Sequence, residues 1–196
     1  MAESRASVIN FSTRRVYVSQ DAEDNVLVER CRNGDPAAFE PIVERYQRLL
    51  FTVALRMLGD RDEANDAAQN AFVKAYQKLD TFDSSRRFFS WIYRILLNEC
   101  LNFRRDRHQH EPLTPELASV GGPVELLETA ERRRRVQAAV RALPVEQREV
   151  IVLRHFAELS YEAIAEILRV PAKTVKSRLH TARQRLSQML ALDSRS

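Results

Sequence analysis

Apolar residues at helical spacing dominate the last part of the chain and leave little room for a strand. Val175, Leu179, Ala182, Leu186 and Met189 follow one another at intervals of four, three, four and three residues. Because such intervals place side chains on one face of an α-helix, they predict a helix whose apolar stripe faces a core. Similar patterns recur elsewhere, only four of the 196 residues are glycine, and no useful stretch alternates with the period of a strand. The chain is therefore predicted to be all-α.

A shorter helix precedes this one, and the connection between them is brief. Ser160 is a suitable N-cap, and Ile164 and Leu168 follow it at helical spacing. Pro171 cannot continue that helix but can begin the next one, which predicts a helix-turn-helix. Arg169 stands where such turns commonly have glycine, so the turn is expected to be strained or to have a different geometry.

The outward face of the second helix is basic, and no acidic residue interrupts it before Asp193. A field of one sign suits the phosphates of DNA. An αα-hairpin with a solvated basic face is the alternative interpretation. The basic residues are Lys173, Lys176, Arg178, His180, Arg183 and Arg185.

A stretch rich in proline and glycine divides the chain. Residues 106–125 hold three of the seven prolines and two of the four glycines, and they interrupt the helical pattern on both sides. We therefore predict a tail over residues 1–23, a small helical domain over 24–107, a flexible linker over 108–123 and a second small helical domain over 124–192.

The first domain contains clear helix boundaries. Asp35 and Pro36 are expected to begin one helix, Gly59 to end it, and Asp60 to begin another. The first turns of that second helix carry Asp60, Asp62, Glu63 and Asp66. These acids either compensate the helix dipole or form a docking face for a basic partner, and their spacing does not choose between the two.

Residues 85–107 combine aromatic rings with arginines. We expect Phe89 and Tyr93 to be partly exposed beside these arginines. Exposed rings can stack on unpaired bases, which contributes about 1–3 kcal/mol per base. The alternative is a core helix with an ordinary basic surface.

Several classes of site are not expected. Cys31 and Cys100 do not suggest a disulfide framework, and this fits a reducing cytoplasm. No run approaches the roughly 18 apolar residues of a membrane span, so no membrane insertion is expected. His108 and His110 lack the spacing of a metal site. No catalytic residues, cofactor or metal are predicted, because the chain has no phosphate-binding loop, metal-ligand set or nucleophile with a base.

Three motifs in succession resemble the bacterial RNA polymerase sigma factors of the extracytoplasmic-function branch of the sigma-70 family. They lie at residues 66–82, 88–105 and 142–186, and the resemblance covers roughly residues 24–190. It implies a protein that is not an enzyme, binds core RNA polymerase, directs it to promoters and helps to open the duplex. The implied partners are the clamp coiled coil of the largest polymerase subunit, the polymerase flap, promoter DNA and an anti-sigma factor.

The resemblance assigns polymerase docking to the helix that follows Asp60. An acidic residue is usual in the family where Asn70 stands, so part of this contact is expected to differ here. The implied polymerase-binding residues are Asp62, Asp66, Gln69, Asn70, Phe72 and Lys74.

The resemblance also assigns two DNA contacts. The loop over residues 81–87 and the aromatic helix after it look like the element that captures the non-template strand of the downstream promoter box, with Trp91 structural. The strand contacts expected there are Arg86, Arg87, Phe89, Tyr93, Arg94 and Asn98.

The second helix of the helix-turn-helix looks like the reader of the upstream box, with its N-terminal half in the major groove. Thr181 stands where the family often has a base, so promoter preference is expected to differ. The expected base-edge contacts are Lys173, Lys176, Ser177, His180 and Thr181, and the expected phosphate contacts are Thr174, Arg178 and Arg183.

Two small domains that reach two separate promoter boxes cannot be packed rigidly together when bound, but they can close on each other when idle. A stand-alone helix-turn-helix regulator that acts without polymerase is the main alternative. A single-strand nucleic-acid-binding enzyme built on the aromatic helix is a third reading, which the lack of catalytic motifs disfavours.

Overall fold

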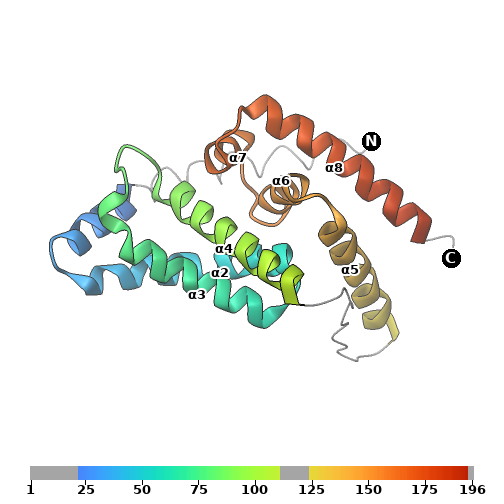
Figure 1. Ribbon diagram of the computed structural model, residues 1–196, viewed down its shortest axis with the longest axis horizontal. Helices are drawn as coiled ribbons and strands as arrows, with labels where there is room; N and C mark the ends of the chain where they lie inside the picture. Colours follow the sequence, from blue (N-terminus) through green and yellow to red (C-terminus); the bar gives the residue numbers. More distant parts are fainter. Residues whose placement is uncertain (1–21, 111–123, 194–196) are drawn as a thin grey trace.

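The computed structural model describes residues 22–110 and 124–193, and the regular structure within these ranges is entirely helical (Figure 1). The all-α prediction is confirmed. A helix over residues 22–32 is followed by the 3₁₀ turn η1 (Pro36–Phe39), α2 (Glu40–Leu58), α3 (Arg61–Gln77), the 3₁₀ turn η2 (Leu79–Thr81) and α4 (Phe88–His110). The C-terminal half contains α5 (Val124–Ala142), α6 (Val145–His155), α7 (Tyr161–Leu168) and α8 (Ala172–Asp193).

The predicted linker and tail fall largely outside the described residues. α4 runs through His110 and so includes the first three residues of the predicted linker, 108–110. The rest of that linker, from residue 111 to 123, and the tail up to residue 21 are not described. None of the described helices is long and apolar enough to cross a lipid bilayer.

The connection between α2 and α3 follows the local sequence signals. Gly59 adopts the left-handed conformation (φ 84°), and its N–H donates to the carbonyl of Leu55 at 2.9 Å. Asp60 then caps α3, because one carboxylate oxygen accepts from the backbone N–H groups of Asp62 at 2.8 Å and Glu63 at 2.9 Å. The predicted end of one helix and start of the next are confirmed.

The predicted start at Asp35 is wrong in detail. Pro36–Phe39 forms a 3₁₀ turn, and α2 begins at Glu40. The carboxylate of Asp35 caps no backbone N–H, because it accepts instead from the guanidinium of Arg30, whose Nη2 lies 2.6 Å away.

The N-terminal core lies among α2, α3 and α4, each of which contacts the other two. α3 approaches its neighbours closely because its buried side chains are small. They are Ala64, Ala67, Ala68, Ala71 and Ala75.

In the C-terminal half, α7 and α8 form the predicted helix-turn-helix. The hydroxyl of Ser160 accepts from the N–H of Ala163 at 3.1 Å and so caps α7. Arg169 ends α7 in the left-handed region (φ 53°), where glycine was expected, and Glu158 before α7 has a similar backbone (φ 55°). Two residues with side chains therefore hold strained conformations on either side of this helix.

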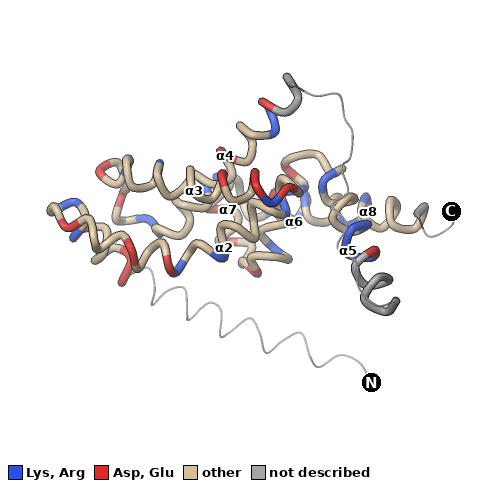
Figure 2. The backbone as a smooth tube through the Cα atoms, turned by 90° about the horizontal axis from the view of Figure 1, so that it is seen from below, with Lys and Arg blue, Asp and Glu red and all other residues tan. Residues whose placement is uncertain are grey.

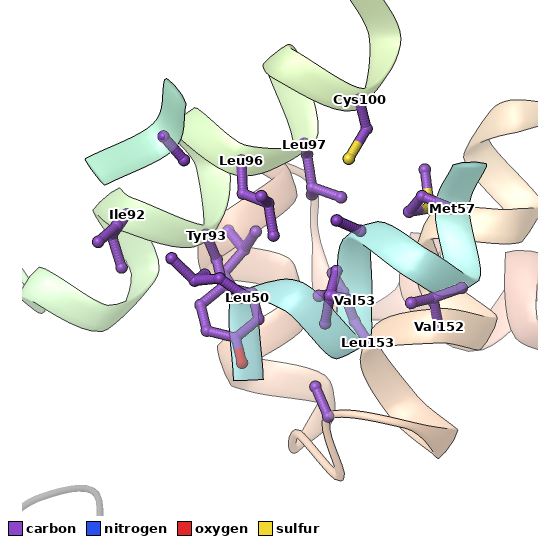
Figure 3. Close-up of a cluster of buried hydrophobic side chains, with 14 of the residues drawn as sticks. Leu50, Val53, Met57, Ile92, Tyr93, Leu96, Leu97, Cys100, Val152 and Leu153 are labelled. Carbon is purple, nitrogen blue, oxygen red and sulfur yellow. The ribbon is translucent and has the colours of Figure 1, made fainter. Parts of the chain in front are cut away.

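The two halves are in contact along α2 and α4. α2 packs against α5 and α6, and α4 packs against α7. Figure 3 shows side chains from α2 and α4, among them Val53, Met57 and Leu97, in one cluster with Val152 and Leu153 of α6.

Polar contacts reinforce this junction at the carboxyl end of α2. The amide of Gln137 on α5 donates to the carbonyl of Arg56 at 3.1 Å, and its oxygen accepts from the Arg56 guanidinium at 2.7 Å. The same guanidinium lies 4.5 Å from the ring centroid of Phe156. Donors from the C-terminal half therefore satisfy carbonyls that the last turn of a helix leaves without partners.

Candidate nucleic-acid and protein interfaces

The first half of α8 presents the basic surface that the sequence predicted. The apolar side of the helix is buried at Val175, Leu179 and Ala182. Figure 2 shows that the part of α8 nearest the C-terminus carries no lysine or arginine. Of the predicted contacts, Lys173, Lys176, Ser177, His180 and Arg183 are exposed, whereas Thr174, Arg178 and Thr181 are half-buried.

Lys176 lies on the surface over an aromatic ring of the neighbouring helix. Its Nζ is 5.7 Å from the ring centroid of Tyr161, and the guanidinium of Arg154 lies 5.1 Å from the same centroid. Arg154 also donates to the carbonyl of Leu159 at 2.7 Å. An exposed cation–π contact is weak, about 0.5–1 kcal/mol, so a phosphate or base edge can compete for Lys176.

Two neighbouring groups modify this surface. The ring of His155 lies 3.4 Å from a guanidinium nitrogen of Arg183, and burial together with Arg183 and Arg154 lowers the pKa of His155. This ring is therefore neutral at pH 7 and adds no charge. The hydroxyl of Thr181 donates to the carbonyl of Ser177 at 3.2 Å, so it can offer DNA an acceptor without losing that bond.

The loop before α4 has a fixed turn followed by exposed cations. The carboxylate of Asp83 accepts from the backbone N–H of Ser85 at 3.0 Å, from its hydroxyl at 2.6 Å and from Nε of Arg86 at 3.3 Å. These hydrogen bonds, first those from Ser85, lower the pKa of Asp83. Arg86 and Arg87 are exposed, and Arg87 lies 3.9 Å from Glu166 of α7 across the junction between the halves.

The prediction that Phe89 and Tyr93 are partly exposed is wrong. Their exposed fractions are 3% and 1%. The ring centroid of Phe89 lies 4.6 Å from that of Tyr93 and 6.3 Å from that of Tyr46 on α2. Figure 3 shows Tyr93 inside the cluster beside Leu50. The two rings are covered because α4 packs against α2 and α3 and also against α7.

Another ring remains partly accessible on α4. Trp91 is half-buried and packs against Phe82 and Phe88, with centroid distances of 5.2 and 5.5 Å. Arg94, which is half-buried, and Asn98, which is exposed, follow Trp91 at intervals of three and four residues on the same helix. We call Trp91, Arg94 and Asn98 the outer face of α4.

The predicted polymerase-binding residues on α3 separate into two groups. Asp62, Asp66, Gln69 and Asn70 are exposed. Phe72 is half-buried against the core. Lys74 turns toward α4, where its Nζ lies 2.6 and 2.7 Å from the carboxylate oxygens of the buried Glu99.

Two exposed apolar side chains continue the exposed surface of α3. Val73 is 53% exposed and Tyr76 is 44% exposed, and the ring of Tyr76 contacts Phe39 at 5.1 Å. Neither residue was predicted from the sequence, because a valine and a tyrosine within a helical pattern indicate a core. Together with the four exposed polar residues they form what we call the α3 face.

The described residues offer no sign of metal or thiol chemistry. No group of three or more metal-ligating side chains occurs in residues 22–110 and 124–193, apart from the side chains left undescribed in these ranges. Both cysteines are free, and burial raises the pKa of the Cys100 thiol to about 12. A thiol with this pKa is inert at neutral pH.

Comparison with known proteins matches both halves. Residues 42–110 match the Sigma-70 region 2 family, and residues 133–186 match the Sigma-70 region 4 family. ECF RNA polymerase sigma factor SigW of Bacillus subtilis is 35% identical over 176 residues, which cover 83% of this chain and 94% of the relative. ECF RNA polymerase sigma-E factor of Escherichia coli K12 is 34% identical over 180 residues, covering 85% and 94%.

Two solved structures are similar in both fold and sequence. CnrH, solved in complex with the cytosolic domain of CnrY, aligns with a TM-score of 0.68 at 30% identity and covers 87% of this chain and 99% of CnrH. The sigma factor RpoE of Bartonella quintana, solved with the anti-sigma factor NepR, aligns with a TM-score of 0.62 at 27% identity over 79% and 98%.

Proposed function

The chain belongs to the extracytoplasmic-function branch of the sigma-70 family of RNA polymerase sigma factors, and we propose a division of labour among its described surfaces. As a member it binds core RNA polymerase, directs it to specific promoters and supports transcription initiation. The stand-alone regulator is not favoured, because residues 42–110 match a sigma region rather than a separate signal domain. The observation that carries the proposal is the exposure of an acidic helix face in one half and a basic helix face in the other.

The α3 face docks on the clamp coiled coil of the largest polymerase subunit. It combines the carboxylates of Asp62 and Asp66 with exposed Val73 and Tyr76. Protein interfaces often surround an apolar centre with polar groups, and charge complementarity selects the partner. The C-terminal half is proposed to bind the polymerase flap.

The outer face of α4 and the preceding loop hold the non-template strand of the downstream box. A base captured there must leave the stack, which costs a few kcal/mol. Stacking on Trp91 offsets about 1–3 kcal/mol of that cost, and Arg86 and Arg87 neutralise phosphates. Trp91 thus takes the role that the sequence suggested for Phe89 and Tyr93.

The first half of α8 reads the upstream box in the major groove. We assign base-edge contacts to exposed Lys173, Lys176 and His180, because the N-terminal part of a recognition helix enters the major groove, and a phosphate contact to exposed Arg183. The ion pair between Arg87 and Glu166 and the α4–α7 packing close the two halves on each other. Engagement of both boxes therefore requires these contacts to open.

A partner that stabilises the closed arrangement would keep the factor idle. RpoE of Bartonella quintana was solved in complex with the anti-sigma factor NepR, and an anti-sigma factor is proposed as this partner by analogy. The chain itself is proposed to catalyse no reaction and to act in the cytoplasm, where polymerase and promoters lie.

Transcription from purified components tests the proposal. Core RNA polymerase is incubated with fragmented genomic DNA, with and without the full chain, and the transcripts are sequenced. We expect discrete start sites that depend on the chain and disappear as salt is raised. Binding of the chain alone to a palindromic duplex, with no new start sites, would support the stand-alone regulator instead.

A further inference from the structure

The helix over residues 22–32 holds the loop that leads into α4, and Arg32 makes most of the contacts. Nε of Arg32 donates to the carbonyl of Leu79 at 3.1 Å, and Nη2 donates to the same carbonyl at 2.6 Å. Nη2 also donates to the carbonyl of Phe82, and Nη1 lies 3.3 Å from the hydroxyl oxygen of Ser84. The side chain is only 19% exposed, so these contacts form in a partly dry environment.

Two more residues of the same helix take part in these contacts with the loop. The carboxylate of Glu29 lies 2.6 Å from Nη1 of Arg32 and accepts from the hydroxyl of Ser84 at 3.3 Å. The amide of Asn25 donates to the carbonyl of Ser84 at 3.2 Å. Residues 25, 29 and 32 share one helix face, because they are four and three residues apart.

The segment that this helix holds in place, residues 79–84, determines where the exposed part of the loop begins. Phe82 packs against Phe88 and Trp91, at centroid distances of 5.4 and 5.2 Å, so its placement also supports the accessible ring. α4 begins at Phe88. Only residues 85–87, which include Arg86 and Arg87, lie between Ser84, the last residue that this helix contacts, and the first residue of α4.

We propose that Arg32 is a positioning residue for selection of the downstream single strand. It fixes Leu79, Phe82 and Ser84 and thereby presets residues 85–87 and Trp91 for the strand before DNA arrives. This proposal rests on the proposed function of the loop and of the outer face of α4. Preorganisation of this kind adds affinity and selectivity, because the loop is not ordered at the expense of binding.

Arginine suits this role better than lysine. Its planar guanidinium offers five N–H donors in a fixed geometry, so it can join two carbonyls and a hydroxyl that belong to different residues. Lysine offers a single ammonium and cannot span the three acceptors in the same way.

Four variants of the full chain test the proposal. Arg32→Ala removes the hydrogen bonds from the guanidinium to the loop, Arg32→Lys keeps the positive charge without the planar guanidinium, and Ser84→Ala removes one acceptor. Arg30→Ala is the matched control, because Arg30 belongs to the same helix but pairs with Asp35 at 2.6 Å on an exposed surface. Thermal melting verifies that each variant is folded.

The first readout is hydrogen exchange of the backbone amides of residues 82–87 in the chain alone. We expect Arg32→Ala to speed exchange there at least tenfold and to leave α2 and α3 unchanged, with a smaller change in Arg32→Lys and Ser84→Ala. Arg30→Ala should match the unmodified chain. Unchanged exchange over residues 82–87 in Arg32→Ala overturns the positioning role, whatever the DNA experiment shows.

The second readout uses the chain assembled with core polymerase and a pool of single-stranded DNA oligonucleotides with six randomised positions. We expect the unmodified chain to enrich a preferred base at least fivefold at one position or more, and Arg32→Ala to reduce that enrichment below twofold while it still binds polymerase. Full enrichment by a variant with a loosened loop overturns the role of Arg32 in selection. No enrichment by the unmodified chain would contradict the proposed function of the loop itself. The exchange data would still test separately whether Arg32 holds the loop in place.

Discussion

The guanidinium of Arg148 on α6 donates from Nη1 to the main-chain oxygen of Met57 on α2 at 2.9 Å, joining residues 91 positions apart in the sequence. The same group donates to the carbonyls of Leu143, at 3.1 Å, and Arg141. Burial, with the nearby charges of Arg104 and Arg141, lowers the pKa of Arg148 to about 10. The group remains charged at pH 7 and lies at the negative end of the α2 dipole.

Replacement of Arg148 is expected to destabilise the fold and loosen the closed arrangement. Arg148→Ala leaves buried carbonyls without donors, and we expect a loss of about 2–3 kcal/mol in the free energy of unfolding. Urea denaturation measures the loss, and small-angle scattering should show a larger radius of gyration. Arg132→Ala, on an exposed part of α5, is the control. A compact, fully stable Arg148→Ala chain would show that this contact does not hold the halves together.

Phe89 and Trp91 should respond differently to truncation. Phe89→Ala empties a buried site and is expected to lower the free energy of unfolding by about 3–5 kcal/mol. Trp91→Ala should cost less stability, because that ring is only partly buried, and should weaken binding of single-stranded DNA. Urea denaturation and oligonucleotide binding by the polymerase-bound protein separate the effects. Equal effects of both variants in both measurements would contradict the assignment of the ring.

Charge reversal on the α3 face tests polymerase docking. Asp66 is exposed, so Asp66→Lys should change stability by no more than about 0.5 kcal/mol. We expect it to reduce capture of core polymerase at least tenfold, because a cation would face the proposed basic partner. Glu44→Lys, an exposed reversal on α2, controls for the change in net charge. Unchanged capture by the Asp66 variant would remove this residue from the interface.

Lys176 distinguishes base reading from phosphate binding. If it contacts a base edge, Lys176→Ala should reduce discrimination at one position of the upstream box by about 1–3 kcal/mol. The measurement is a set of binding titrations against single-base variants of that box. A uniform loss on all sequences would identify a phosphate contact instead. Arg132→Ala again controls for the loss of an exposed positive charge, here on α5 rather than on α8.

The contribution of Glu149 to the stability of the protein should fall as pH rises toward neutrality. Burial raises the pKa of Glu149 to about 7, although Arg178 and Arg104 oppose this shift and Glu146 adds to it. Between about pH 4.5 and 7 Glu149 therefore binds a larger share of a proton in the folded state than in the unfolded state, and its contribution to the free energy of unfolding declines with pH.

The effect amounts to about 3 kcal/mol at most, and it levels off above the pKa of the folded state. Denaturation of the unmodified chain and of Glu149→Gln across this range measures it. The Gln variant should lack this component. Parallel pH profiles for the two chains would show that Glu149 is not its source.

Local signals predicted the fold well because they act over a few residues. Asp60 and Ser160 cap the helices that they were expected to cap, and Gly59 ends α2. The exposure of the basic half of α8 was predicted correctly, because the spacing of the apolar positions identified the buried side of the helix. Even Arg169, which stands at a position suited to glycine, holds the left-handed conformation that the turn demands.

The errors and omissions depend on contacts between distant parts of the chain. Phe89 and Tyr93 read as surface rings because the pattern of α4 alone does not reveal that α7 also covers it. Arg32 gave no signal, because its partners on Leu79 and Phe82 lie 47 and 50 residues away. Trp91 packs against Phe82 and Phe88, which agrees with the prediction that it is structural; its partial exposure gave no signal, because a single large ring within an apolar pattern usually belongs to a core.

The left-handed backbone at Glu158 and Arg169 places conformational strain on both sides of α7, outside every hydrophobic cluster. Left-handed geometry costs a residue with a Cβ atom about 1–2 kcal/mol. Relief of this strain in the turns around α7 would therefore raise the thermal stability of the protein without repacking a single buried side chain.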